Sequence, residues 1–332
     1  MTYFVDAYSY IGLSCILQAQ SGRHELDTRK DVKMKITLFY KHATVLDYAY
    51  LDDHKGVVGG ALIVNAEFIG ETDEEGVVYD FSYAKKKVKE IIDLECDHRL
   101  VAPAHLVQTK NGISKLEYKY GFNEELMTYE CPEEGICQIP YAQVSKANIE
   151  AHLETLILKE MPKTVTAVKI ELVEEVLPEG KPVFHYTHGL KEHYGNCQRL
   201  FHGHQNTVDV FINGDQVAEL EEHLAKDVFK GNVHFLLWDN VSNKYEVLKY
   251  TDGQPAVGRF PEIPKVEIQY ESSQGIFKGS LPGRAIYFMD EETTVENLSI
   301  HFAKLVKSTC DLDDIVTVRA YEGIAKGSIT TI

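Results

Sequence analysis

The stretch Cys197-Gln198-Arg199-Leu200-Phe201-His202-Gly203-His204 is the most informative segment of the chain. Residues two apart on a β-strand point to the same face of the sheet, so His202 and His204 can bind one metal ion from one side. The glycine between them allows another backbone or a substrate to approach closely. The pattern therefore predicts a strand that carries two metal ligands.

A third imidazole can come from the segment Phe184-His185-Tyr186-Thr187-His188, which precedes this strand. Three protein ligands on zinc leave one coordination position for water or substrate, as in catalytic sites. His188 is the preferred third ligand, and His185 and His193 are alternatives. Because the chain contains 14 histidines, an accidental His-x-His pair is an equally open interpretation.

Cys197 precedes the ligand strand in what we predict to be a loop. A divalent cation and a nearby base can lower the pKa of a thiol enough for it to act as a thiolate. A single cysteine is also commonly a small buried apolar residue, and this alternative stays open.

Composition predicts a packed globular protein without a nucleic-acid or membrane partner. The chain has 332 residues, 44% of them hydrophobic, and a formal net charge of −17, which repels phosphate backbones. No apolar run reaches the roughly 18–20 residues that span a bilayer, and the N-terminus lacks the basic region of a signal peptide. The six cysteines are scattered along the chain, which favours reduced thiols and a cytoplasmic location.

Hydrophobic periodicity predicts an α+β protein in which the order of elements recurs. In the first half, strands are predicted at 36–46, 57–68, 115–120 and 164–173, and helices at 80–96 and 146–158. After a connector at 177–182, strands are predicted at 183–187, 207–212 and 315–321, helices at 217–227 and 295–307, and a strand-rich region at 233–270. Residues 1–35 show no periodicity and are interpreted as an N-terminal extension.

The two halves can be aligned with offsets that grow slowly along the chain. Gly59 matches Gly203 at an offset of 144, residues 145–149 match 294–298 at 149, and residues 167–171 match 318–322 at 151. Insertions in loops produce such growth, so we infer a duplicated unit with copies at 36–176 and 177–332. Chance similarity between two domains of this class is the alternative.

Together these motifs resemble the 6-pyruvoyl-tetrahydropterin synthase and 6-carboxy-tetrahydropterin synthase family. The resemblance rests on residues 197–204 with His188 and Glu322, on Tyr79-Asp80-Phe81 followed by a helix and Cys96-Asp97-His98-Arg99-Leu100, and on Thr293-Thr294-Val295-Glu296-Asn297-Leu298. It covers roughly residues 36–332, in two copies. The combination is specific, although no single motif is.

The resemblance implies two tandem tunnelling-fold (T-fold) units, each an antiparallel sheet with two helices, and a Zn²⁺ site. The family's functional residues carry over to the zinc ligands His188, His202 and His204, the general base Cys197 with its assisting pair Asp97 and His98, and the pterin-ring residues Glu322, Thr293 and Thr294. The implied protein is a homo-oligomeric lyase with a small-molecule pterin substrate, 7,8-dihydroneopterin triphosphate.

The product stays open at this point. The carboxy branch, which feeds queuosine-type deazapurines, usually has three residues between the cysteine and His-Gly-His, and the pyruvoyl branch usually has five. This chain has four, residues 198–201, and matches neither. An aldolase-like branch replaces the cysteine by glutamate, so Cys197 argues against it. A non-catalytic T-fold protein that binds a pterin or purine, or acts as a scaffold, is the alternative function.

The two halves depart from the family pattern in complementary ways. The first half has Val58-Gly59-Gly60 in place of His-Gly-His, and the second half lacks an Asp-His pair after its first helix. We therefore hypothesise that Asp97 and His98 reach Cys197 across an interface between unlike halves, within one chain or between chains. The alternative is a decayed first half in which Asp97 only caps a helix.

Overall fold

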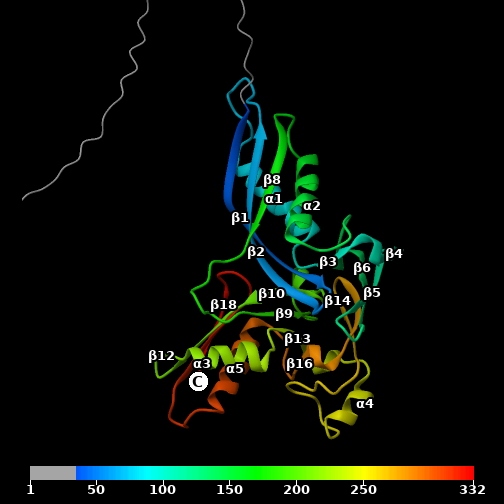
Figure 1. Ribbon diagram of the computed structural model, residues 1–332, viewed down its shortest axis with the longest axis vertical. Helices are drawn as coiled ribbons and strands as arrows, with labels where there is room; N and C mark the ends of the chain where they lie inside the picture. Colours follow the sequence, from blue (N-terminus) through cyan, green and yellow to red (C-terminus); the bar gives the residue numbers. More distant parts are fainter. Residues whose placement is uncertain (1–34) are drawn as a thin grey trace, which may run out of the picture. The chain divides into compact units, whose positions relative to one another are not determined.

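Four β-sheets and several α-helices make up residues 35–332, which are the residues that the computed structural model describes (Figure 1). Over this range the chain is a mixed α+β protein, as predicted. The N-terminal extension predicted for residues 1–35 lies outside the described residues, apart from Lys35. No helix between residues 35 and 332 combines the length and the apolar character that a membrane span requires.

The first half of the chain forms a five-stranded sheet covered by two helices. The strand order is β7 (Ile136–Ile139), β3 (Leu100–Pro103), β1 (Ile36–Asp52), β2 (Gly56–Gly70) and β8 (Val165–Val173). The helices α1 (Phe81–Glu95) and α2 (Lys146–Lys159) share one apolar core with these strands. Helix α1 begins where the sequence predicts, because the Asp80 carboxylate accepts hydrogen bonds from the backbone N–H groups of Ser82 and Tyr83.

The second half contributes two four-stranded sheets. One has the order β10 (His202–Asn206), β9 (Phe184–His188), β13 (Asn232–Leu237) and β16 (Ile286–Met289), and the other has the order β12 (Asp215–Gln216), β11 (Val208–Ile212), β17 (Val316–Tyr321) and β18 (Gly327–Thr331). Helix α5 (Val295–Lys307) contacts β17 and β18. The helix predicted at 217–227 forms as α3 (Ala218–Glu222) followed by π-helical turns over His223–Val228.

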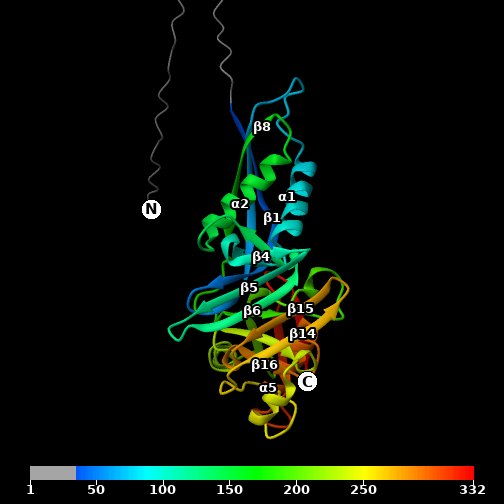
Figure 2. The same cartoon turned by 90° about the vertical axis from the view of Figure 1, so that its right-hand side faces the viewer.

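A fourth sheet contains strands from both halves of the chain. Its order is β14 (Val266–Ser272), β15 (Gly275–Leu281), β6 (Glu125–Pro132), β5 (Ile113–Tyr120) and β4 (Val107–Lys110), and Figure 2 shows these strands side by side. Strand β15 pairs antiparallel with β6, with Lys278 opposite Glu130. The two halves are therefore joined by backbone hydrogen bonds as well as by side-chain packing.

Three expectations from the sequence are corrected by the structure. The sheets are mixed rather than antiparallel, because β3 pairs in parallel with β1 and β7, and β13 pairs in parallel with β9 and β16. Such pairs need crossover connections, which helices and hairpins supply here. The second half also has more than two helices, since α4 (Lys244–Val247) is present as well. The strand-rich region predicted at 233–270 is a strand only at its two ends, in β13 and β14.

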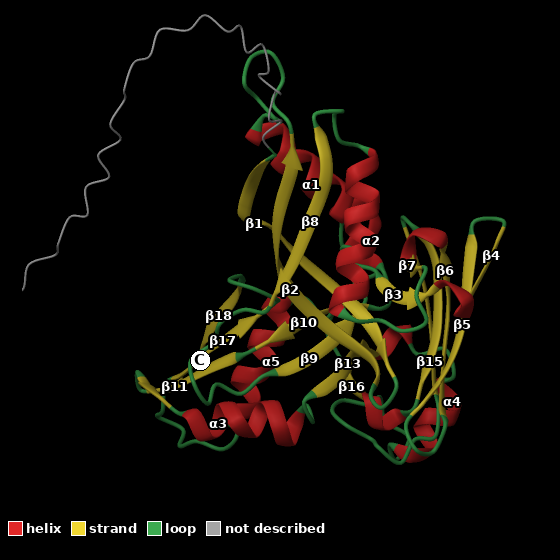
Figure 3. Cartoon of the chain, turned by 45° about the horizontal axis from the view of Figure 1, so that its top comes forward, coloured by secondary structure: helices red, strands yellow, loops and turns green. Residues whose placement is uncertain are grey.

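The backbones of the two halves approach each other closely at a pair of glycines. Strand β2 contacts β9 and β10, as Figure 3 shows, and a methyl group on Gly59 would lie 2.0 Å from the backbone oxygen of Tyr186. A methyl group on Gly203 would lie 2.7 Å from the Cα atom of Gly59. The backbones can approach this closely only without side chains at both positions. The strand that carries His202 and His204 is therefore packed directly against the first half.

Candidate metal centre

Strands β9 and β10 bring three histidines together. They pair antiparallel in a register that places His202 opposite His188, and the alternation along β10 returns His204 to the same face. The ring nitrogens that His188, His202 and His204 offer lie within 4.8 Å of one another. All three side chains are buried. The structure thus brings together the three residues that the sequence indicated as metal ligands.

Hydrogen bonds at the other ring nitrogen orient two of these imidazoles. His188 Nδ1 donates to the Thr293 carbonyl oxygen at 2.8 Å, and His202 Nδ1 donates to the Arg199 carbonyl oxygen at 2.9 Å. These bonds leave the Nε2 lone pairs free, which is the tautomer that a metal ligand requires. Burial lowers the pKa of His188 and of His202 well below the usual value, so both rings are neutral.

The Nε2 atoms of all three histidines are buried and lack a hydrogen-bond partner among residues 35–332. A buried polar atom without a partner is costly, and three such atoms that converge at one place are uncommon. A metal ion between them would satisfy all three at once. The residues present therefore fit a divalent metal of the kind that imidazole nitrogen binds.

The alternative third ligands are engaged elsewhere. His185 Nδ1 donates to the backbone oxygen of Gly59 at 2.8 Å, across the contact between the halves. His193 is exposed, and its Nδ1 donates to the Tyr194 carbonyl oxygen. Within residues 35–332 neither belongs to a cluster of potential metal ligands.

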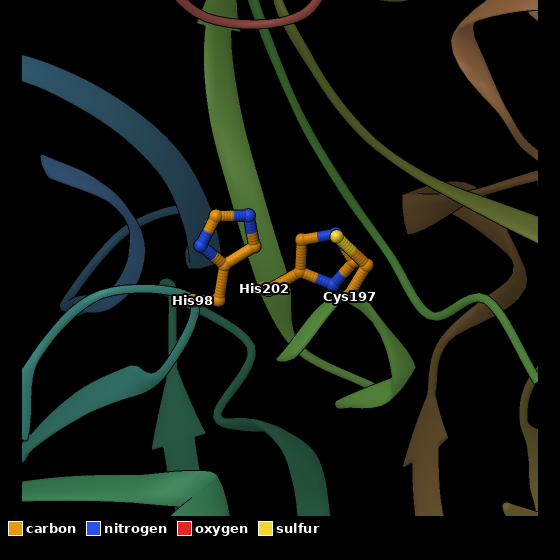
Figure 4. A group of neighbouring side chains, drawn as sticks. All are labelled: His98, Cys197 and His202. Atoms are coloured by element: carbon orange, nitrogen blue, oxygen red, sulfur yellow. The ribbon is translucent and has the colours of Figure 1, made fainter. Parts of the chain in front are cut away.

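Cys197 and His98 lie beside His202, although they come from different halves of the chain (Figure 4). The Cys197 sulfur and ring nitrogens of His98 and His202 lie within 4.8 Å of one another. Cys197 lies in the short 3₁₀ turn Gly195–Gln198, directly before strand β10, and is half-buried. A thiol, an imidazole and the candidate metal centre therefore share one site within a single chain.

The Asp97 carboxylate orients His98. His98 adopts a left-handed backbone conformation with φ of 54°, and its Nδ1 lies 2.5 Å from Asp97 Oδ2. Burial opposes protonation of His98, but hydrogen bonds and charges from Asp97 and Cys197 raise the pKa of His98 to about 10. The other carboxylate oxygen of Asp97 accepts a hydrogen bond from the Asp47 N–H group at 3.0 Å. Asp97 thus forms hydrogen bonds with both His98 and strand β1, so its role is not limited to capping a helix.

The three residues predicted to bind the pterin ring differ in their hydrogen-bond partners and in their burial. Thr293 is buried, and its carbonyl oxygen accepts the hydrogen bond from His188 Nδ1. The Thr294 hydroxyl caps helix α5 by accepting a hydrogen bond from the Asn297 N–H group. Glu322 follows β17, is half-buried, and its N–H group donates to the Lys326 carbonyl oxygen at 3.0 Å. Contact of these residues with a pterin stays a prediction.

Sequence reasoning missed two features of the site. Asp47 lies on β1, with one carboxylate oxygen 3.3 Å from His204 Nδ1 and the other 2.9 Å from Lys326 Nζ. Burial opposes ionisation of Asp47, but His204 and Lys326 lower its pKa to about 2. The buried Arg199 guanidinium donates to the carbonyl oxygen of Asp97, so it links the halves. An acidic residue inside an apolar strand was the only sequence signal for Asp47.

Comparisons with known proteins give the following results. No protein-family model and no curated protein matches the chain. Among solved structures, a catalytic-residue mutant of Plasmodium vivax 6-pyruvoyltetrahydropterin synthase is 20% identical, and the match covers 42% of this chain and 92% of that chain with a TM-score of 0.34. The corresponding synthase of Plasmodium falciparum is 18% identical, with coverage of 42% and 90% and a TM-score of 0.33.

Proposed function

We propose that the chain is a zinc-dependent pterin synthase that acts on 7,8-dihydroneopterin triphosphate and forms 6-carboxy- or 6-pyruvoyl-tetrahydropterin. One observation carries this proposal. Three buried imidazole nitrogens without partners among the described residues converge beside the Cys197 thiol and the His98 imidazole. The same residues are those that the resemblance to the pterin synthase family assigns to zinc and to proton transfer.

Zinc is the metal we propose, because the donor set is three imidazoles. Such a set is typical of catalytic zinc, with a fourth position for water or substrate. The half-buried Cys197 would lie beside that position. When bound, zinc would polarise oxygens of the substrate side chain and so acidify the neighbouring C–H groups.

The residues around the metal supply the proton transfers. Cys197 as a thiolate would remove a proton from the substrate side chain. His98, oriented by Asp97, would exchange protons with Cys197, the substrate or solvent. Elimination of triphosphate or cleavage of the side chain would follow, and the residue set does not favour one product over the other.

Glu322 is the residue we propose to anchor the pterin ring, near Thr293 and Thr294. A carboxylate can accept two parallel hydrogen bonds from the adjacent N–H groups of a 2-aminopyrimidinone. The Glu322 N–H group lies 3.0 Å from the Lys326 carbonyl oxygen, to which it donates. Burial opposes protonation of Lys326, but Asp47 and, to a smaller extent, the Glu322 charge raise the pKa of Lys326. This proximity supports a place for Glu322 at the edge of the same site.

We also propose that the chain consists of two T-fold units, 36–176 and 177–332, that form one site between them. The strand order β7-β3-β1-β2 corresponds to β16-β13-β9-β10, and the parallel pairs occur at the same places in both. This correspondence supports the inferred duplication. Assembly of the chain into a homo-oligomer in the cytoplasm belongs to the same proposal.

The function is tested by incubating the purified full chain with 7,8-dihydroneopterin triphosphate and identifying the products by mass. We expect a tetrahydropterin product, loss of turnover in Cys197→Ala with zinc content retained, and unchanged turnover in Cys310→Ala. Tight binding of the pterin with equally negligible turnover in the wild type and Cys197→Ala would overturn the synthase and support a non-catalytic pterin-binding protein.

A further inference from the structure

We propose that Asp47 is a positioning residue for the metal centre, so that the first half of the chain supplies the carboxylate that orients the metal ligand His204. This inference rests on the metal centre of the proposed function. It assigns to the first half a part in metal binding, although this half lacks a His-Gly-His segment of its own.

The side chains of Asp47 and His204 are in contact at the metal centre. Asp47 Oδ1 and His204 Nδ1 lie 3.3 Å apart, within ion-pair distance although outside hydrogen-bond geometry. Both atoms are buried, and neither has another hydrogen-bond partner among residues 35–332. Each is therefore the natural partner of the other, and His204 Nε2 is left for the metal.

The Nδ1 atoms of the three histidines face different kinds of group. His188 and His202 donate from Nδ1 to backbone carbonyl oxygens. His204 instead faces the side-chain carboxylate of Asp47. A carboxylate on the far nitrogen of a metal-binding histidine fixes the ring and raises its basicity, and its loss typically weakens metal binding about 10- to 100-fold.

Hydrogen bonds of its backbone N–H and C=O groups fix the position of Asp47. Its N–H group donates to Asp97 Oδ1 at 3.0 Å, and its carbonyl oxygen accepts a hydrogen bond from the His98 N–H group at 2.7 Å. In strand β1 it lies opposite Ala61 of β2. The strand that places His98 beside Cys197 thus also places the Asp47 carboxylate beside His204.

The loop that follows Glu322 packs onto the same carboxylate. Asp47 Oδ2 lies 2.9 Å from Lys326 Nζ, and a methyl group on Gly323 would lie 2.3 Å from Asp47 Oδ1. The Gly323 N–H group donates to Asn206 Oδ1 on strand β10 at 2.8 Å. Asp47 therefore contacts both the metal ligand His204 and the loop that directly follows Glu322, the proposed pterin anchor.

The test is the zinc affinity of the full chain, measured by competition with a chromophoric chelator. We expect Asp47→Ala to bind zinc about 10- to 100-fold more weakly than the wild type. Asp47→Asn keeps an oxygen that can accept from Nδ1, so we expect a smaller loss of zinc affinity than in Asp47→Ala. Asp227→Ala, which removes an exposed carboxylate from a surface pair with His223, should leave the affinity unchanged.

A second readout separates positioning from general stability. The absorption spectrum of bound Co²⁺ reports the ligand geometry, so we expect it to change in Asp47→Ala and to return towards the wild type in Asp47→Asn. Wild-type zinc affinity in folded Asp47→Ala would overturn the inference while leaving the synthase intact. Should Asp47→Ala not fold, wild-type zinc affinity in Asp47→Asn overturns it instead. Absence of zinc binding in the wild type would overturn the metal centre itself, together with the proposed function.

Discussion

The imidazole of His98 and the thiol of Cys197 lie at one site, although they belong to turns in two separate halves of the chain. Arg199, two residues after Cys197, donates to the carbonyl oxygens of Asp97 and His98 and so holds the two segments together. The interface between unlike halves is therefore formed within one chain.

His98 is expected to be needed for turnover and dispensable for metal binding. Because a positioned general acid or base typically contributes 10²- to 10⁴-fold, His98→Ala should lower kcat by about that factor and keep its zinc. The exposed His105 offers a matched control, and His105→Ala should retain kcat. Steady-state kinetics with metal analysis checks this. Equal kcat in His98→Ala and the wild type would remove His98 from the mechanism.

Gly59 is expected to be essential for the contact between the halves. A Cβ atom at this position would lie 2.0 Å from the Tyr186 oxygen and 2.6 Å from the His204 nitrogen, so the strands must separate. We expect Gly59→Ala to lower the free energy of unfolding by about 3 kcal/mol or more. Gly180→Ala meets no atom within 4 Å and should cost only the left-handed backbone strain, about 1 kcal/mol. Similar losses in urea unfolding of the two variants would contradict the close crossing of β2 and β10.

The buried His234 is expected to make the metal-free protein less stable in acid. Burial lowers the pKa of His234 to about 3 in the folded state, whereas the unfolded value is about 6.5. Between about pH 3 and about pH 6.5 only the unfolded chain binds this proton. The stabilisation is therefore fully present above about pH 6.5 and is lost progressively as the pH falls below that value. From about pH 7.5 to about pH 5.5, the free energy of unfolding of the wild type should fall by about 1.4 kcal/mol more than that of His234→Gln.

Urea unfolding of the metal-free wild type and of His234→Gln at both pH values measures this difference. The glutamine can still bond to the Thr187 hydroxyl, which His234 Nδ1 contacts at 2.9 Å. The same pH dependence in both proteins would show that His234 does not titrate as its burial implies.

Thiol reactivity should distinguish Cys197 from the cysteines of the core. Within residues 35–332, Cys96, Cys131 and Cys137 are buried, Cys197 and Cys310 are half-buried, and these five are free thiols. In the native metal-free chain, an alkylating reagent should modify Cys197 and Cys310 first and reach the other three only after unfolding. Peptide mass spectrometry measures the order. Early modification of Cys131 in native protein would contradict its place in β6.

The strand of the candidate metal centre could be predicted from sequence because its signal is local. The two-residue period of a strand puts His202 and His204 on one face, and the structure has this arrangement. The placement of His98 beside Cys197 needed a comparison between the two halves, since neither segment contains information about the other. Asp47 was missed because its partners, His204 and Lys326, are distant in sequence and its own neighbours are apolar.

The errors in the predicted fold have a similar origin. Apolar residues at 238–265 were interpreted as strand, but Val247 belongs to helix α4, and Ala256 and Ile263 belong to irregular segments that pack into an apolar core. The pairing of β15 with β6 depends on contacts between the halves, and strand patterns do not identify their partners. Periodicity therefore predicts which segments bury a face, and tertiary packing determines the rest.

We expect one zinc ion to bind to the three histidines beside a thiol and an imidazole of the same chain. An anomalous difference map at the zinc absorption edge, from crystals of the full chain grown with zinc, tests it most directly. We predict one peak per chain, ligated by His188, His202 and His204, with Cys197 and His98 of that chain next to it. The absence of a peak there, or a peak ligated by other residues, would show that these histidines do not form the zinc site.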